Sequence, residues 1–100
     1  MPMKNPPHPG ELIRECIHDL RLSVLEVAAG LDISRQQLHN VIAGRSGLAV
    51  PLAVRLEKAF GGTAATWLAM QSAHDLAMAR AATGVKKVPD YAKRGGRERV

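Results

Sequence analysis

The sequence predicts an all-α fold of five helices around one core. Apolar residues recur at helical spacing in successive segments, and only the stretch 85–88 leaves room for a short strand. Two segments also open with Ser followed three residues later by Glu or Gln, which is the pattern of a capping box at a helix start. One hundred residues suffice for one small core but not for two.

The first helix is expected to begin at His8-Pro9-Gly10, because proline suits the first helical position, where its missing N–H costs nothing. Residues 1–7 before it are predicted to be a flexible lead. The apolar residues that share one side of this helix, and that we expect to be buried, are Leu12, Ile13, Cys16, Ile17 and Leu20.

The second and third helices carry the two capping boxes. Ser23 opens the second with Glu26 as its partner, and Ser34 opens the third with Gln37. Only residues 31–33 separate these helices, which leaves space for nothing except a helix-turn-helix bend.

A fourth helix is predicted from Pro51, and Gly61-Gly62 ends it. Its expected buried side consists of Ala53, Leu56, Ala59 and Phe60. Thr63 then caps the fifth and longest helix, from Ala64 to about Ala82, in which Trp67 is expected to join Phe60 in the core. The predicted domain spans residues 8–83.

Residues 84–100 are predicted to form a basic, disordered tail. They contain Lys86, Lys87, Lys93, Arg94, Arg97 and Arg99 against only Asp90 and Glu98, whereas residues 1–83 carry eight basic and seven acidic groups. The net charge of +5 therefore belongs mostly to the tail and does not by itself establish DNA binding. Either nonspecific attraction to phosphate or a merely solubilising end explains such a tail.

The third helix has the chemistry of a DNA reader. Its polar residues gather on one side and Leu38 and Val41 on the other. Arg, Gln and Asn have the paired donors and acceptors that match base edges in the major groove. The predicted DNA-binding residues are Ser23, Ser34, Arg35, Gln36, His39, Asn40 and Arg45. Because one reading helix covers only a half-site, we also expect a homodimer on double-stranded DNA.

At this point the sequence resembles a known family. His8-Pro-Gly-Glu-Leu12, the helix-turn-helix at 23–44, Ala53-Val-Arg-Leu56 and Trp67-Leu-Ala-Met-Gln71 with His74-Asp-Leu76 follow in order. This pattern is similar to the HigA-type (VapI-like) antitoxins among the lambda-repressor-like Xre/Cro helix-turn-helix proteins. The resemblance implies a homodimeric antitoxin that neutralises a RelE/HigB-like mRNA-cleaving toxin and represses its own operon by binding operator DNA through the helix at 34–43.

Three positions depart from the family pattern. Asp32 stands where glycine is common at the turn, and Asp tolerates the left-handed conformation better than most residues. Val24 replaces a phosphate-contacting Gln, and His74 replaces an aromatic residue, which is expected to loosen the packing of the fifth helix. Because Val24 lacks the phosphate contact, a third possibility is a protein that only neutralises a partner and whose helix-turn-helix has decayed. The main alternative is a free-standing Xre-family regulator without a toxin.

Two further surfaces are predicted. Glu11, Glu15 and Asp19 form an acidic line along the first helix, which is either a solvated face or a docking strip for a basic toxin. Met70, Leu76 and Met78 on the fifth helix are candidates for the dimer interface.

The sequence gives no support for an enzyme. The four histidines fall on different predicted elements without metal-binding spacing, and there is no phosphate-binding glycine loop or nucleophile elbow. We therefore expect no catalytic residue, cofactor or metal.

The single Cys16 excludes an internal disulfide, and no apolar run approaches the roughly 20 residues of a membrane span. The N-terminus lacks a signal-peptide pattern, so we expect a cytoplasmic protein without a membrane partner.

Overall fold

The structure, a computed structural model, describes residues 6–82 and 88–94 of the chain. Five helices form the predicted domain: α1 (Pro9–Asp19), α2 (Val24–Gly30), α3 (Arg35–Ile42), α4 (Val50–Phe60) and α5 (Ala64–Ala81). A further turn of helix, α6 (Tyr91–Arg94), lies within the segment predicted as a tail. No strand occurs in the described parts of the chain, which confirms the all-α prediction. Most of the stretch 85–88 and four of the tail's basic residues lie outside those parts.

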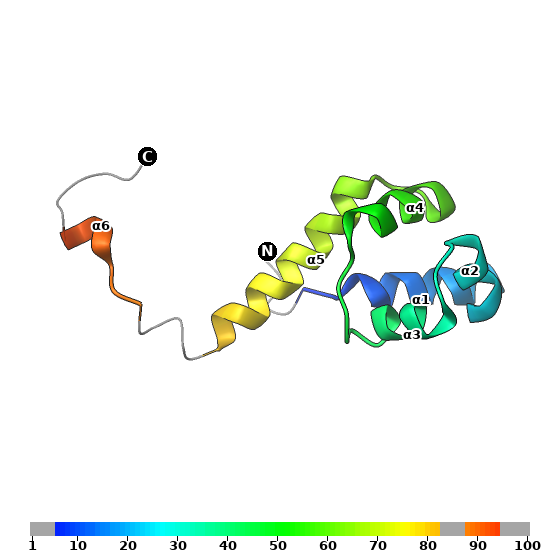
Figure 1. Cartoon of the computed structure of the whole chain (residues 1–100), viewed down its shortest axis with the longest axis horizontal. Coiled ribbons are helices and arrows are strands. Elements are labelled where there is room, and N and C mark those ends of the chain that lie inside the picture. The colour runs from blue at the N-terminus through cyan, green and yellow to red at the C-terminus, as the bar shows by residue number, and fades with distance from the viewer. Residues whose placement is uncertain (1–5, 83–87, 95–100) are drawn as a thin grey trace.

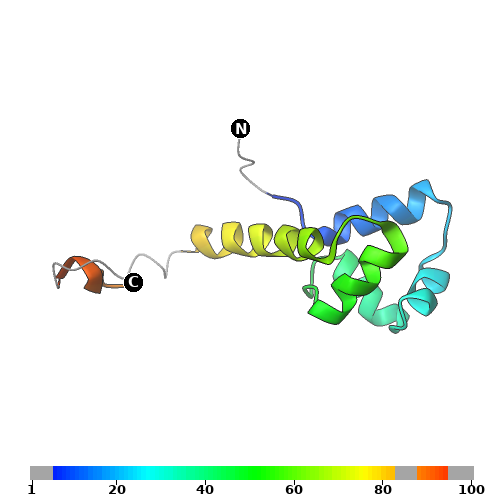
Figure 2. The same ribbon diagram turned by 90° about the horizontal axis from the view of Figure 1, so that it is seen from above.

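The helices pack as two groups that share one core. α3 lies against both α1 and α2, while α4 packs along the first half of α5 (Figure 1). The second half of α5 extends away from the other four helices of the domain in both views (Figures 1 and 2). The core consists of Ile13, Ile17, Val27, Ala28, Leu31, Leu38, Val41, Ala53, Leu56 and Trp67. Trp67 is therefore a core residue as predicted, and Phe60 is half-buried against the same cluster.

Both predicted capping boxes are present. The Ser23 hydroxyl accepts from the Glu26 N–H at 3.1 Å, and the Ser34 hydroxyl accepts from the Gln37 N–H at 3.0 Å. In return, the Glu26 and Gln37 side chains accept from the serine N–H groups at 2.8 and 2.9 Å. Asp32 adopts φ 57° in the turn between α2 and α3, so the bend forms without glycine. Each cap satisfies backbone donors that helix starts leave free, which defines where α3 begins.

The predicted buried stripe of α1 is partly wrong. Only Ile13 and Ile17 are buried; Cys16 is half-buried, and Leu12 and Leu20 are exposed. The reason is that only a narrow face of α1 is buried, formed by Pro9, Gly10, Ile13 and Ile17, and Leu20 stands at the C-cap, beyond the last helical residue.

A compact corner joins α4 to α5. Gly61 and Gly62 both have positive φ, and the Trp67 indole N–H donates to the Gly61 carbonyl at 3.0 Å. The Ala64 N–H donates to Glu57 Oε1 at 2.8 Å, so the end of α4 caps the start of α5. Two details differ from expectation: α4 begins one residue before Pro51, and Ala59 is exposed because it lies at the edge of the stripe formed by Ala53 and Leu56.

Candidate nucleic-acid interface

α3 separates a packing face from a polar face. Leu38 and Val41 are buried in the core, while Arg35, Gln36 and His39 are exposed. A basic, amide-bearing surface on a helix whose other side is anchored is the arrangement with which helix-turn-helix proteins read the major groove. The structure thus brings these predicted residues together on one surface.

Gln36 and Asn40 form a hydrogen-bonded pair on this surface. Gln36 Nε2 donates to Asn40 Oδ1 at 3.1 Å, one helical turn away. The Gln36 amide retains a free carbonyl oxygen and a second N–H, both on an exposed side chain. An acceptor beside a donor is the pattern that pairs with the N6 amino group and N7 of adenine. The pair can therefore present an ordered amide to a base edge.

Arg45 stands in the loop that follows α3. Gly44 before it has φ 78°, and the Arg45 backbone N–H donates to the Asn40 carbonyl at 2.8 Å. These contacts fix the backbone of the loop to the end of the helix while the Arg45 side chain stays exposed. An exposed arginine beside a helix of this kind has the charge and reach of a phosphate contact.

The two predicted serine contacts are primarily helix caps. Ser23 and Ser34 accept backbone hydrogen bonds through their oxygens, which leaves each hydroxyl hydrogen for a further acceptor such as a phosphate oxygen. Val24, the departure at the start of α2, is half-buried against the core. Its side chain thus contributes packing rather than a polar contact.

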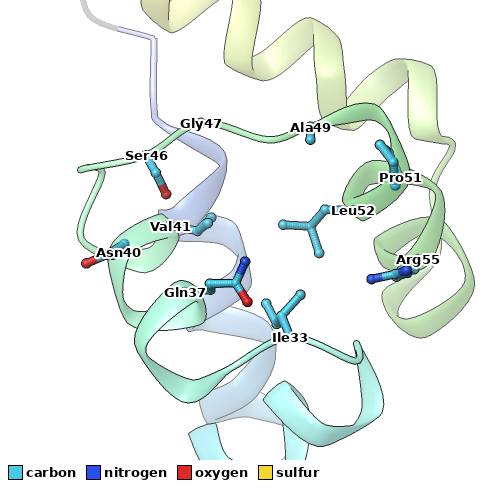
Figure 3. A pocket seen from close by; sticks show the side chains of 10 residues that line it. All are labelled: Ile33, Gln37, Asn40, Val41, Ser46, Gly47, Ala49, Pro51, Leu52 and Arg55. Atoms are coloured by element: carbon cyan, nitrogen blue, oxygen red, sulfur yellow. The ribbon is translucent and has the colours of Figure 1, made fainter.

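A groove of about 430 Å³ runs beside α3 and separates it from α4. Gln37 from α3 and Leu52 from α4 project into it, and Arg55 lies at its α4 side (Figure 3). The Arg55 guanidinium donates to the Leu31 carbonyl at 3.1 Å, at the end of α2. Arg55 therefore connects α4 to the helix-turn-helix bend. Arg55 lies within the family motif at 53–56, but sequence reasoning assigned it no role, because its partner is a backbone carbonyl 24 residues away.

The acidic line on α1 lies on a largely exposed surface. Glu15 and Asp19 are exposed, and Asp19 lies 3.5 Å from His18 Nδ1. Glu11 instead accepts a hydrogen bond from the His8 backbone N–H at 3.3 Å and so stabilises the start of α1. On α5, Leu76 and Met78 are about half exposed, whereas Met70 packs against the core.

Nothing in the described residues suggests chemistry at a metal or thiol. No group of three or more His, Cys, Asp or Glu side chains within the described ranges is arranged to hold a metal ion. Burial raises the pKa of the Cys16 thiol, and the charges of Asp19 and Glu15 act in the same direction. The raised pKa favours the neutral thiol over the nucleophilic thiolate.

Two curated relatives match most of the chain. Virulence-associated protein A′ of Dichelobacter nodosus is 41% identical over 75 residues, which are 74% of this chain and 65% of that protein. An uncharacterised helix-turn-helix transcriptional regulator of Escherichia coli K12 is 30% identical over 88 residues, which cover 88% of this chain and 94% of the regulator. The chain matches no protein-family model.

Solved structures with the same fold include antitoxins. An addiction module antidote protein of the HigA family from Coxiella burnetii has a TM-score of 0.77 and 33% identity, covering 87% of this chain and 99% of that one. The chain belongs to the VapI/HigA family of Xre-type helix-turn-helix proteins. Its relatives in this family are described as antitoxins, virulence-associated proteins and transcriptional regulators, not as enzymes.

Two members of this fold group have been solved with DNA. A Pseudomonas aeruginosa protein in complex with its operator DNA is 30% identical, with a TM-score of 0.76 and coverage of 83% of this chain and 92% of that one. The antitoxin HigA of Pseudomonas aeruginosa, solved with the higBA promoter, is 29% identical, with a TM-score of 0.77 and coverage of 85% of this chain and 97% of that one.

None of the described helices of this VapI/HigA protein is long and apolar enough to span a membrane.

Proposed function

We propose that this VapI/HigA protein is the antitoxin of a type II toxin–antitoxin pair. It binds operator DNA through α3 to repress its own operon, and it neutralises a RelE/HigB-like toxin that cleaves mRNA. The exposed face of α3 is the observation on which the proposal mainly rests, because Arg35, Gln36 and Asn40 offer base-reading groups on a helix anchored from behind. The HigA structure solved with promoter DNA supports the DNA-binding part of the proposal. Because operator DNA and an mRNA-cleaving toxin are both found in the cytoplasm, the proposal implies a cytoplasmic protein.

The proposed DNA interface combines base and phosphate contacts. Gln36, Asn40 and Arg35 read bases, while Arg45, His39 and the serine hydroxyls at the two helix starts contact the backbone. Leu76 and Met78, which are exposed on the second half of α5, are the proposed dimer contact. A dimer is expected because helix-turn-helix proteins read two half-sites about one DNA turn apart.

For the toxin surface we propose the acidic line of α1, centred on Glu15. An RNA-cleaving partner needs a cationic surface for its substrate, and exposed carboxylates can attract such a surface before contact. Glu15→Lys should then slow association with the toxin, whereas Arg14→Glu on the same helix should not. Equal association rates for Glu15→Lys and the wild type would remove this surface from the proposal.

A free-standing regulator is the second candidate. The helix-turn-helix regulator of Escherichia coli, matched over 94% of its length, favours it. The antitoxin and the regulator differ in whether the protein has a small basic toxin as its binding partner.

The deciding experiment is a pull-down of the tagged protein from its native host, with mass spectrometry of stoichiometric partners. Recovery of a small basic RelE-like protein supports the antitoxin, and recovery of the chain alone from cells that express neighbouring reading frames supports the regulator. A gel shift with the DNA upstream of its own gene tests the shared DNA-binding role. Binding that weakens steeply with salt is expected, and no binding at low salt would leave only a partner-binding protein.

A further inference from the structure

The loop between α3 and α4, residues 43–49, is held near both of its ends. Near its start, the Arg45 N–H donates to the Asn40 carbonyl at 2.8 Å. Near its end, the Leu48 N–H donates to Gln71 Oε1 on α5 at 3.1 Å. The exposed Arg45 side chain therefore stands on a loop that is tied to α3 on one side and to α5 on the other.

The Gln71 amide can take only one orientation in this site. Gln71 is 8% exposed, and its Nε2 donates to Asp75 Oδ1 at 2.9 Å. The Asp75 carboxylate can only accept and the Leu48 N–H can only donate, so a reversed amide would lose both hydrogen bonds. Asp75 therefore orients the amide, and the amide holds the loop.

Gly47 packs closely against the same amide. A Cβ on Gly47 would lie 3.1 Å from Gln71 Cδ and 3.2 Å from Gln71 Oε1, which is tighter than ordinary van der Waals contact. Gly47, Gln71 and Asp75 also border one hollow of about 370 Å³ together with Arg45. The contact between the loop and α5 thus combines a hydrogen bond with close packing next to Arg45.

The part of α5 that holds the loop is itself attached to the start of α1. His74 Nδ1 lies 3.0 Å from the Pro6 carbonyl oxygen, which can only accept, so this nitrogen carries a hydrogen. The His74 ring centroid is 5.0 Å from that of the buried His8, whose Nδ1 accepts from the Gly10 N–H and caps α1. Instead of loosening α5, His74 links it to the segment that precedes α1. The loop is therefore held by a part of α5 that is fixed in place.

We propose that Gln71 is a positioning residue for DNA binding, which holds the α3–α4 loop so that Arg45 meets the DNA backbone beside α3. The inference rests on the proposed DNA-binding function and adds to it a residue that is buried and does not touch DNA. If the loop is released from α5, Arg45 samples more positions, and ordering it on a phosphate costs more conformational entropy. Release should therefore weaken the Arg45 contact and leave base discrimination by α3 unchanged.

The first pair of variants is Asp75→Ala and Asp75→Asn. Both remove the same charge near the loop, but only asparagine keeps an acceptor for the Gln71 amide. A positioning role predicts that Asp75→Ala binds DNA more weakly than Asp75→Asn. Helix propensity favours alanine over asparagine, so it cannot produce this order.

The second pair changes Gln71 itself. Gln71→Met has a side chain of similar length but no amide, and it leaves the Leu48 N–H without its acceptor. Gln71→Glu combined with Asp75→Asn exchanges the two groups, so that a carboxylate accepts from Leu48 and an amide donates to that carboxylate. This exchange keeps the net charge and both hydrogen bonds. Ser72→Ala, at an exposed position of the same helix, is the control.

The first readout is the affinity for a duplex selected from a random-sequence pool, and for an unrelated duplex. Gln71→Met should lose about fivefold in affinity for both duplexes, and the exchanged pair should recover the parental affinity. Ser72→Ala should bind as the parent does. Each variant is also combined with Arg45→Ala. In that background the loss caused by Gln71→Met should disappear, because the contact through which Gln71 acts is already absent.

The second readout is amide hydrogen exchange of the free protein, which does not depend on DNA. The Leu48 amide should exchange faster in Gln71→Met than in the parent and recover in the exchanged pair. The Leu38 amide, which donates to the Ser34 carbonyl at 3.1 Å within the anchored helix, should keep its rate in all variants.

Parental affinity of Gln71→Met, or a loss that is just as large without Arg45, would overturn the inference. If the Leu38 amide also exchanges faster in Gln71→Met, this variant has loosened the whole fold, and the Asp75 pair decides instead. Equal affinities of Asp75→Ala and Asp75→Asn would then reject the positioning role. If even the parent binds no duplex, the proposed function fails, whereas the Leu48 amide still shows whether Gln71 holds the loop.

Discussion

α3 and the second half of α5 both present an exposed surface, but of opposite chemistry. In α3 every exposed position is polar or charged apart from Ala43 just beyond its end, and the apolar residues Leu38 and Val41 are buried. In the second half of α5 the apolar residues Leu76 and Met78 remain 50% and 49% exposed, because the helix extends past the other helices of the domain (Figure 2).

The difference indicates what each surface binds. Burial within the domain accounts for the apolar side of α3, and its outer side is suited to a polar, charged ligand such as DNA. The apolar side chains of the second half of α5 have no comparable cover within the described domain, and large exposed apolar surfaces commonly mark protein interfaces. In the proposed function, α3 therefore combines folding and recognition on two faces, whereas α5 divides them between its two halves.

Leu38→Ala tests the inner face of α3 and should have the largest effect. Leu38 is fully buried, so its truncation should lower the free energy of unfolding by about 2–5 kcal/mol. Chemical denaturation followed by circular dichroism measures the loss. A loss below about 1 kcal/mol would mean that the core can collapse around the cavity, and that α3 is held less firmly than its burial indicates.

Gln36→Ala tests the outer face of the same helix. We expect a loss of about 1–3 kcal/mol in discrimination at one operator position, with unchanged unfolding. Arg45→Ala is the matched comparison, because loss of a phosphate contact should weaken operator and unrelated DNA alike and reduce the salt slope by about 1. Competition gel shifts with single-base operator variants distinguish the two. Unchanged operator affinity for Gln36→Ala would end its assignment as a base reader.

Ser34→Ala tests the start of α3, where the inner and outer faces meet. Loss of the cap should cost about 1 kcal/mol of stability, whereas Ser34→Asp keeps the cap and adds a negative charge beside the DNA. Thermal unfolding should rank Ser34→Asp near the wild type and Ser34→Ala below it, while DNA binding should be weakest for Ser34→Asp. If both variants unfold like the wild type, the serine cap contributes little to the start of the helix.

Local patterns predicted the helix starts well because their causes are local. Ser23 and Ser34 each find their capping partner three residues away, and Asp32 can adopt the left-handed turn by itself. These interactions depend on nearby residues, so the sequence contains the information directly. The capped start of α3, and with it the orientation of the candidate DNA-reading face, was predictable for this reason.

What could not be predicted depends on contacts between distant segments. His8 is not among the usual capping residues, and its role follows from a buried site shared with His74, 66 positions later in the chain. Arg55 reaches a carbonyl of the helix-turn-helix bend from another helix. Leu12 follows helical spacing as well as Ile13 does, and only the width of the actual contact decides that Leu12 is exposed. Periodicity identifies a face, and packing decides how much of it is buried.

Leu76→Asp tests the second half of α5 and should have the smallest effect on the isolated fold. Because half of this side chain is already exposed, the free energy of unfolding of the monomer should change by no more than about 0.5 kcal/mol. Self-association should nevertheless weaken, since the charge would be buried without a partner in the proposed dimer.

Leu25→Asp on α2 is the control, because Leu25 is 62% exposed but lies outside the proposed interface. Sedimentation equilibrium over a range of concentrations should give a monomer for Leu76→Asp and a dimer for Leu25→Asp. A dimer in both would move the interface away from α5, and a monomer in both would implicate α2 as well. A stability loss like that of Leu38→Ala would instead mean that the two regions differ less than their exposure indicates.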